Sequence, residues 1–283
     1  MKQIQLIALD MDGTLLASDH WTVPEENIKA IQRAHRAGIH VCICTGRLLE
    51  DASDFCRRLE LPCLLISGNG ARAADGLLPD AHVFYKQNFV PADAHAALDI
   101  LLDSRLMINA LEDGLVSTRK SDENAMYHLA RRGLVKAAYG IDALRAAAER
   151  GVMKFFCVAD AGQEDELTRV RRRLCKEMPH LNITSSSPNN IELMPAGVGK
   201  GTALEKMADH LHLSRQQVMA MGDAHNDLSM LEYAYHSVAM GNAVADVKRI
   251  CRYETDTNDA CGVAQMIHRV LESREEKEWK KLP

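Results

Sequence analysis

Short apolar segments alternate with helix-like segments at both ends of the chain, and this alternation limits the folds that it can adopt. In the first third, the apolar segments cover residues 6–10, 40–46 and 63–71, and the last third repeats the pattern. Strands this continuously apolar are typical of a parallel sheet that is covered on both faces. The sequence therefore predicts an α/β fold in which both ends of the chain build one doubly wound, mainly parallel sheet.

The middle of the chain, from about Phe84 to Asn190, has a different pattern of predicted helices and strands. Longer helix-like segments alternate there with short strand-like ones, which is typical of an α+β domain. The predicted helices cover residues 91–105, 122–150 and 164–178. Residues 107–119 are predicted to form a strand or a hairpin, and residues 152–160 a strand. Residues 181–194 are predicted to form a strand that returns to the first sheet. We therefore expect a core of residues 1–83 and 191–283, with residues 84–190 as an inserted domain.

Two aspartates, Asp10 and Asp12, directly follow the first apolar segment. Open α/β sheets bind their ligands at the carboxyl ends of the strands, and Gly13 lets the chain turn away sharply. Two carboxylates there can divide the work of phosphoryl transfer. One acts as the nucleophile, and the other protonates the leaving group and then activates water.

Two further segments suit a phosphate. Thr45 and Gly46 end an apolar segment and offer a hydroxyl and a backbone amide that can approach a phosphate oxygen closely. The alternative is an ordinary strand-to-helix turn with a capping threonine. Lys200, between Gly199 and Gly201 at a predicted helix start, offers a positive charge beside free amides, although by itself it suggests a surface lysine.

The segment GDAHND brings two more acids to a strand end. Asp223 ends an apolar segment and Asp227 lies four residues on, so their carboxylates can converge on a hard cation. Carboxylates around a phosphate repel one another unless a cation such as Mg²⁺ offsets their charge. Charge balance thus predicts Mg²⁺, with Asp10 and Asp223 as direct ligands, Asp12 binding through its backbone carbonyl, and Asp227 holding the others in place.

Together, DMDGT, CTGR, GVGKG and GDAHND match in order and spacing the four motifs of the haloacid dehalogenase (HAD) superfamily. The further segments SGNGA, PNNIELMPAGVGKG, VAMGNA and TNDACGVA resemble its Cof-type subgroup, subclass IIB, whose members carry a cap domain between the second and third motifs. The resemblance covers the whole chain. It implies that residues 84–190 form a substrate-specificity cap, that Asp10 is the aspartyl-phosphate nucleophile and that Asp12 is the acid/base.

The same resemblance implies the remaining site residues. Asp223 and Asp227 are the acids of the magnesium site. The phosphate-binding residues are Met11, Thr45, Gly46, Lys200 and Asn226. Asn69 either lines the cleft or belongs to an Asn-Gly turn, and His225 is either a substrate contact or a solvated histidine at a helix entry.

Composition limits the partners. The chain has 283 residues, 26% of them charged, and a net charge of −5, which offers no polybasic surface for nucleic acid. It shows neither a signal peptide nor an apolar stretch long enough for a membrane span. We expect a cytoplasmic protein whose partner is a small phosphorylated metabolite, without nucleic acid or membrane binding; its oligomeric state is left open.

The leading hypothesis is a Mg²⁺-dependent phosphatase that hydrolyses a sugar phosphate or cofactor-type phosphate through a covalent aspartyl-phosphate. One alternative is a phosphomutase of the same superfamily, which returns the phosphoryl group to the sugar. Another is a non-catalytic sensor of a phosphorylated metabolite, although its expected mark, loss of the motif acids, is absent. The candidate residues for contacting the leaving group are Asn109, Glu112, Ser117, Arg119, Asn189 and Asn190, all equally consistent with hairpin or turn positions.

Overall fold

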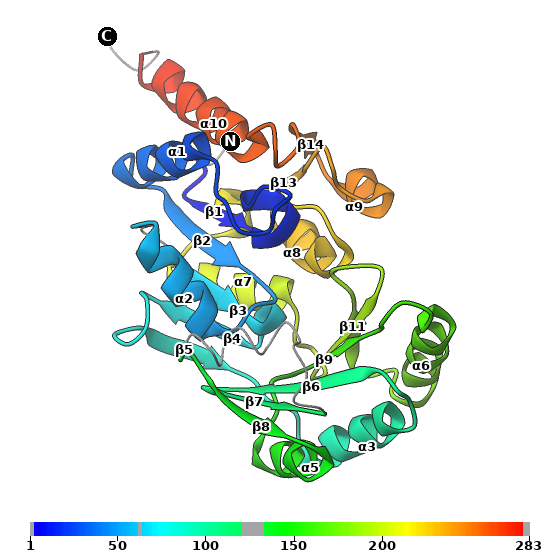
Figure 1. The fold of residues 1–283 in the computed structure, drawn as a ribbon. Coiled ribbons are helices and arrows are strands. Elements are labelled where there is room, and N and C mark those ends of the chain that lie inside the picture. The colour runs from blue at the N-terminus through cyan, green and yellow to red at the C-terminus, as the bar shows by residue number, and fades with distance from the viewer. Residues whose placement is uncertain (1–2, 62–63, 120–132, 280–283) are drawn as a thin grey trace.

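The larger of two sheets contains strands from both ends of the chain. The computed structural model describes residues 3–61, 64–119 and 133–279. Eight strands form this sheet, in the order β14-β13-β12-β1-β2-β3-β4-β5 (Figure 1). The parallel strands are β1 (Leu6–Leu9), β2 (His40–Cys44), β3 (Leu64–Ser67), β12 (Val218–Gly222), β13 (His236–Ala239) and β14 (Tyr253–Glu254). β4 (Arg72–Asp75) and β5 (His82–Lys86) extend the sheet by antiparallel pairing. The predicted mainly parallel sheet is confirmed.

Helices cover both faces of this sheet, as the apolar strands require. In β1, Ile7 and Leu9 point to one face and Leu6 and Ala8 to the other, so each face has its own apolar core. The first face carries α1 (Glu25–Arg36), α2 (Leu49–Arg58) and α10 (Gly262–Trp279), and α1 lies beside α10 near the amino terminus (Figure 1). The second face carries α7 (Lys200–His210), α8 (Leu228–Tyr233) and α9 (Ala245–Ile250).

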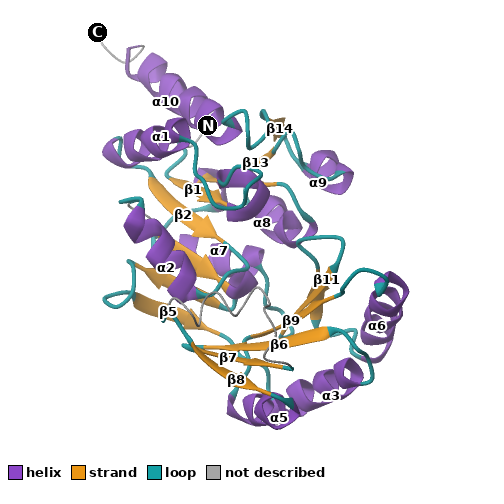
Figure 2. Cartoon of the chain, in the orientation of Figure 1, coloured by secondary structure: helices purple, strands orange, loops and turns teal. Residues whose placement is uncertain are grey.

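The second sheet belongs to the middle of the chain. It has six strands in the order β10-β11-β9-β6-β7-β8. Their bounds are β6 Met107–Glu112, β7 Leu115–Thr118, β8 Lys136–Tyr139, β9 Lys154–Val158, β10 Asn182–Thr184 and β11 Asn190–Met194. Helices α3 (Pro91–Leu102), α5 (Ile141–Arg150) and α6 (Glu164–Glu177) pack on the face that points away from the larger sheet (Figure 2). The other face of this sheet is therefore not covered by these helices and faces the core.

The helix predicted over residues 122–150 is wrong in part. Lys136–Tyr139 forms strand β8, which pairs in parallel with β7, and helix α5 begins only at Ile141. Residues 122–132 of the prediction lie outside the described residues. The segment KAAY favours a helix by composition, and pairing with a neighbouring strand overrides that preference.

The strand predicted to return to the first sheet over residues 181–194 is also wrong. This segment forms an antiparallel pair, β10 and β11, and β11 pairs with β9 of the second sheet. β5 belongs to the first sheet, although the predicted boundary after residue 83 cuts through it. The division into a core of residues 1–83 and 191–283 and a cap of residues 84–190 stays a prediction, and the strand pairings favour boundaries after Lys86 and Met194.

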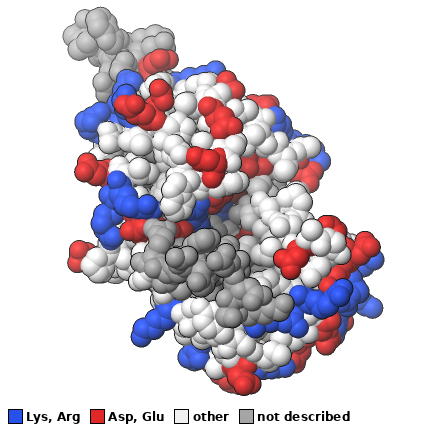
Figure 3. Space-filling model, in the orientation of Figure 1, with Lys and Arg blue, Asp and Glu red and all other residues white. Residues whose placement is uncertain are grey.

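Charged side chains of both signs are mixed on one face of the molecule. On the face shown in Figure 3, Lys and Arg are interspersed with Asp and Glu among the described residues. The helices that the structure describes include none with the length and apolarity that a bilayer crossing needs. The predicted absence of nucleic-acid and membrane binding stays a prediction.

Candidate active site

A cavity of about 420 Å³ lies where the carboxyl ends of β1, β2 and β12 face the second sheet. These three strands are adjacent, so the segments that follow them meet at one edge, as the sequence predicted. The core contributes acidic, basic and glycine residues to the wall: Asp10, Asp12, Gly13, Gly46, Arg47 and Asp223. The second sheet and its loops contribute Leu111, Lys154, Phe156, Ser186, Asn190 and Glu192.

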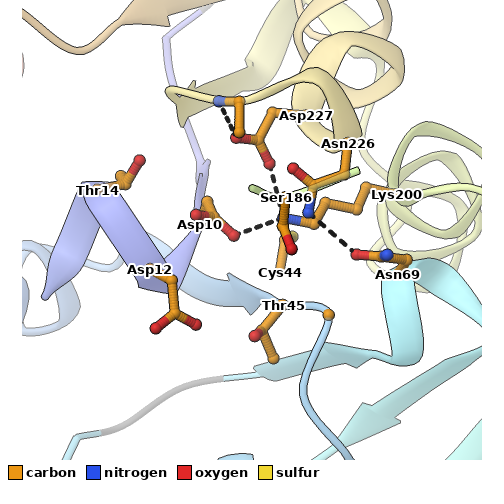
Figure 4. Close-up of polar contacts among 12 residues, drawn as sticks. Asp10, Asp12, Thr14, Cys44, Thr45, Asn69, Ser186, Lys200, Asn226 and Asp227 are labelled. Atoms are coloured by element: carbon orange, nitrogen blue, oxygen red, sulfur yellow. Dashed lines mark hydrogen bonds and ion pairs between the residues drawn. The ribbon is translucent and has the colours of Figure 1, made fainter. Parts of the chain in front are cut away.

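Lys200 is the positive charge at the centre of the site. It begins α7 and is 0% exposed, so it is a buried residue and not a surface lysine. Its Nζ contacts Asp10 Oδ1 and lies 2.6 Å from Asp227 Oδ1 (Figure 4). Burial alone would lower the pKa of Lys200, but the two carboxylates raise it above its ordinary value. Lys200 is therefore charged at neutral pH.

Three acids surround this lysine, and their charge exceeds what it can balance. One carboxylate oxygen from each of Asp10, Asp223 and Asp227 lies within 4.8 Å of the other two. Burial, with a contribution from Asp227, raises the pKa of Asp10 well above its ordinary value despite the opposite effect of Lys200. Burial and the charge of Asp227 also raise the pKa of Asp223 to about 7. An all-oxygen donor set with excess negative charge fits a hard divalent cation such as Mg²⁺.

Hydrogen bonds hold two of these acids in place. Asp227 uses its second oxygen, Oδ2, to accept the backbone N–H groups of Asp223 at 2.9 Å and Ala224 at 3.0 Å. Thr14 donates its hydroxyl to Asp223 Oδ1 at 2.9 Å. A Cβ at Gly13, where φ is +87°, would lie 2.4 Å from Asp223 Oδ2, so only glycine fits between the two strand ends. Both carboxylate oxygens of Asp227 are engaged within the protein, which agrees with its predicted holding role.

Asp12 points away from Lys200 (Figure 4). Its two oxygens accept a bidentate pair of hydrogen bonds from Arg47, at 3.0 Å from Nε and 2.7 Å from Nη2. His20 also approaches, with Nδ1 at 3.5 Å from Asp12 Oδ1. The sequence analysis missed Arg47, although it directly follows Thr45 and Gly46 in the CTGR segment.

Of the residues predicted to bind phosphate, Gly46 and Asn226 line the cavity described above. Thr45 is buried, and its hydroxyl accepts the backbone N–H of Arg47 at 3.1 Å. Asn226 lines the cavity and donates from Nδ2 to Asn69 Oδ1 at 3.2 Å. The side chain of Met11 is buried in the core between the sheet and α1, so only its backbone is placed to meet a ligand.

Asn69 and His225 were left open between two interpretations. Asn69 is 1% exposed, has a left-handed backbone with φ of +55°, and donates to Glu192 Oε2 at 2.6 Å. It therefore combines an Asn-Gly turn with a place behind the cavity wall. His225 is exposed, lies 3.3 Å from Asp246 Oδ2, and lines a neighbouring cavity of about 530 Å³ instead of the one that contains Asp10. The solvated interpretation of His225 fits this position better.

Most candidates for contacting the leaving group are engaged elsewhere. Glu112 pairs with Arg150 at 2.8 Å, and Arg119 donates to the carbonyl oxygens of Ser104 and Leu106. Asn109 donates to the Phe156 carbonyl at 3.1 Å, and Ser117 lies in strand β7. Asn189 accepts a hydrogen bond from Ser187. Of the six, Asn190 lines the cavity. The sequence analysis missed Lys154 and Glu192, which line it from the first residue of β9 and the middle of β11.

The sequence model of the haloacid dehalogenase-like hydrolases matches residues 7–267. The chain belongs to this family. It is 33% identical to the 5-amino-6-(5-phospho-D-ribitylamino)uracil phosphatase YwtE of Bacillus subtilis, over 95% of this chain and 98% of the relative. It is 31% identical to the HMP-PP phosphatase of Cronobacter sakazakii, over 85% of each chain.

The solved structures agree with this assignment. An HAD subclass IIB sugar phosphatase shares the fold, with a TM-score of 0.78 at 21% identity, over 94% of this chain and 98% of the other. The predicted superfamily and the expectation of a hydrolase whose relatives are phosphatases are thus confirmed.

Proposed function

We propose that this hydrolase is a Mg²⁺-dependent phosphatase that acts on a small phosphorylated metabolite through a covalent phosphate on Asp10. The observation that carries the proposal is that Asp10 and Asp227 contact buried Lys200, while one carboxylate oxygen of each lies within 4.8 Å of one from Asp223. The uracil-derivative and HMP-PP phosphatases among its relatives support a phosphorylated metabolite as the substrate.

Asp10 is the nucleophile in this proposal. Lys200 holds one of its carboxylate oxygens, Oδ1, and leaves Oδ2 to attack phosphorus. As the bond from phosphorus to the leaving oxygen breaks, Asp12 gives that oxygen a proton. Asp12 then takes a proton from a water molecule that attacks the phosphorus, which releases inorganic phosphate and restores the Asp10 carboxylate.

The surrounding donors bind the phosphoryl oxygens. Thr45, the Gly46 amide, Lys200 and Asn226 are the groups that would hold them, as predicted from the sequence. Asp10 and Asp223 would hold Mg²⁺, with Asp227 supporting both, and the ion would supply charge neutralisation to the transferring group. Binding through the Asp12 carbonyl stays a prediction.

Arg47 holds the Asp12 carboxylate in place. Both Asp12 oxygens accept hydrogen bonds from its guanidinium, which fixes the orientation of this side chain. We expect the leaving-group oxygen, once bound, to replace one Arg47 contact. This exchange places the proton donor beside the bond that breaks.

The cavity suits a small leaving group with both apolar and polar parts. Leu111 and Phe156 supply apolar surface, and Ser187 and Asn190 supply polar groups. A volume of about 420 Å³ is in the range of small-molecule sites. Sugar phosphates and cofactor-type phosphates both fit this volume and this mixture of apolar and polar groups. We expect the protein to act on either of them in the cytoplasm.

The test is release of inorganic phosphate from a panel of phosphorylated metabolites that includes both substrates named for the relatives. Wild type and Asp10→Asn are compared with Mg²⁺ and with a chelator. We expect metal-dependent release that the substitution abolishes. Transfer to a sugar hydroxyl without free phosphate would favour the phosphomutase, and binding without any turnover would favour the sensor.

A further inference from the structure

A line of polar side chains, all buried except the half-buried Asn226, connects the second sheet to core groups that are expected to bind phosphate. It consists of Lys154, Glu192, Asn69 and Asn226, together with the backbone of Gly46, and we call it the bridging network. None of its side chains carries a role in the reaction proposed above except Asn226.

An ion pair between two strands of the second sheet starts this network. Lys154 is 3% exposed and Glu192 is 1% exposed, and their charged groups are in direct contact. Ser186 donates its hydroxyl to Glu192 Oε1. Burial alone would raise the pKa of Glu192, but Lys154 lowers it below its ordinary value, so Glu192 is charged at neutral pH.

Each member of this pair then contacts the core. Lys154 Nζ donates to the carbonyl oxygen of Gly46 at 3.0 Å. Glu192 Oε2 accepts from Asn69 Nδ2 at 2.6 Å, and Asn69 Oδ1 accepts from Asn226 Nδ2 at 3.2 Å. Two adjacent strands of the second sheet thus reach two separate groups that are expected to bind phosphate.

The network restricts the positions of the Gly46 backbone and the Asn226 side chain. A Cβ at Gly46 would lie 3.0 Å from Asn69 Oδ1 and 3.2 Å from Lys154 Nζ, so the network packs directly on this backbone. Glu192, a carboxylate, can only accept, which fixes Asn69 with its amide nitrogen toward Glu192 and its oxygen toward Asn226. Asn226 must then turn its own nitrogen toward Asn69, and the second N–H of that nitrogen remains for a ligand.

The charge of the pair points to orientation and not to ion binding. One lysine balances one glutamate, whereas the acids around Lys200 are in excess. Burying an ion pair is expensive, and an apolar pair of the same size often stabilises a fold more. The pair here satisfies its remaining hydrogen-bonding groups on the core, which an apolar pair could not do.

We infer that Lys154 and Glu192 are positioning residues that set the Gly46 backbone and the Asn226 amide to bind the transferring phosphoryl group. The second sheet then completes the phosphate site, besides facing the leaving group. This inference rests on the proposed function, because it assigns phosphate binding to Gly46 and Asn226.

The test measures phosphate binding apart from the leaving group. Inorganic phosphate is titrated into the full-length protein with Mg²⁺ by calorimetry, for wild type, Lys154→Met and Glu192→Gln. Each substitution should weaken phosphate binding about tenfold, because it releases one fixed group of the site. It should also lower kcat/KM by one common factor for p-nitrophenyl phosphate and for the best metabolite.

A matched control comes from another ion pair of the second sheet. Glu112→Gln breaks the pair with Arg150, which does not line the cavity, and should leave phosphate affinity unchanged. The double variant Lys154→Met/Glu192→Met removes both buried charges together. It should melt at a higher temperature than Lys154→Met and still bind phosphate weakly, which separates positioning from folding.

Unchanged phosphate affinity in Lys154→Met and Glu192→Gln would overturn the inference, as would a loss of kcat/KM that differs between leaving groups. Those results would leave the proposed function intact, provided that wild type releases phosphate and Asp10→Asn does not. Failure of wild type to release phosphate from any substrate of the panel would overturn both.

Discussion

Two buried lysines belong to the candidate active site, and they differ in the acids around them. Lys200 of the core has three carboxylates nearby, whereas Lys154 of the second sheet is paired with Glu192. Both lysines are almost fully buried, so burial alone does not distinguish them. Charge balance does, because the first group has negative charge left over for a cation and the second has none. The comparison teaches that the ratio of acids to lysine separates a cation site from a positioning pair.

The largest effect is expected from Asp10→Asn, which removes the nucleophile from the core centre. Phosphate release should fall at least about 10³-fold, because no other group replaces a covalent nucleophile. The measurement is kcat with saturating Mg²⁺. Lys200 keeps Asp227 as its partner, so an intact thermal transition should accompany the loss. Activity near the wild-type level would place the nucleophile elsewhere.

The next largest effect is expected when Lys200 and Lys154 are replaced one at a time. Lys200→Met and Lys154→Met should each destabilise the protein by about 3–5 kcal/mol in the absence of metal, because each leaves a buried carboxylate unpaired. Mg²⁺ should restore part of the stability of Lys200→Met and little of Lys154→Met. Chemical denaturation with Mg²⁺ and with a chelator measures both. Equal rescue of the two variants would contradict the distinction drawn from their charge balance.

The substitution Asp223→Asn tests whether the acids around Lys200 bind a cation. An acid whose pKa is raised to about 7 holds its proton in the folded state, and this stabilising effect is lost as the pH rises through 7. Without metal at pH 8, the variant should therefore melt above wild type, since it lacks a buried charge. Addition of Mg²⁺ should raise Tm for wild type and much less for the variant. A full Mg²⁺ shift in Asp223→Asn would remove this residue from the cation site.

A smaller effect concerns Glu192 in the second sheet. Because the pKa of Glu192 is lowered from its ordinary value of 4.5, its stabilising contribution is present above that pH. It is lost as the pH falls below 4.5 and Glu192 takes up a proton. Between pH 5 and pH 3, wild type should lose more stability in urea denaturation than Glu192→Gln does. Equal losses of stability in wild type and Glu192→Gln would show that Lys154 does not favour the charged form of Glu192.

The sequence predicted which core residues lie together, because strand ends determine their positions; their roles stay predictions. Asp10, Thr45 and Asp223 follow β1, β2 and β12, and parallel strands bring their carboxyl ends to one edge whatever the loops do. The order of those strands did not have to be known in detail. The family motifs added the roles, and the structure places the residues together.

The second sheet could not be predicted as well, because its features depend on which strands pair. Lys154 and Glu192 stand in separate apolar segments, and a single charged residue in a strand suggests an exposed position. Only the pairing of β9 with β11 brings them to one face. The same dependence explains the errors over residues 136–139 and 181–194, where the partner strand decides the conformation.

The most direct test of the central claim is detection of the covalent phosphate on Asp10. The protein is Asp12→Asn, given p-nitrophenyl phosphate and Mg²⁺ and quenched in acid during turnover. p-Nitrophenolate leaves without a proton donor, so the first step should continue, whereas release from Asp10 needs Asp12 to activate water. We predict that mass spectrometry finds a phosphorylated peptide containing Asp10. Continued release of phosphate by this variant with Asp10 always unmodified would contradict the account.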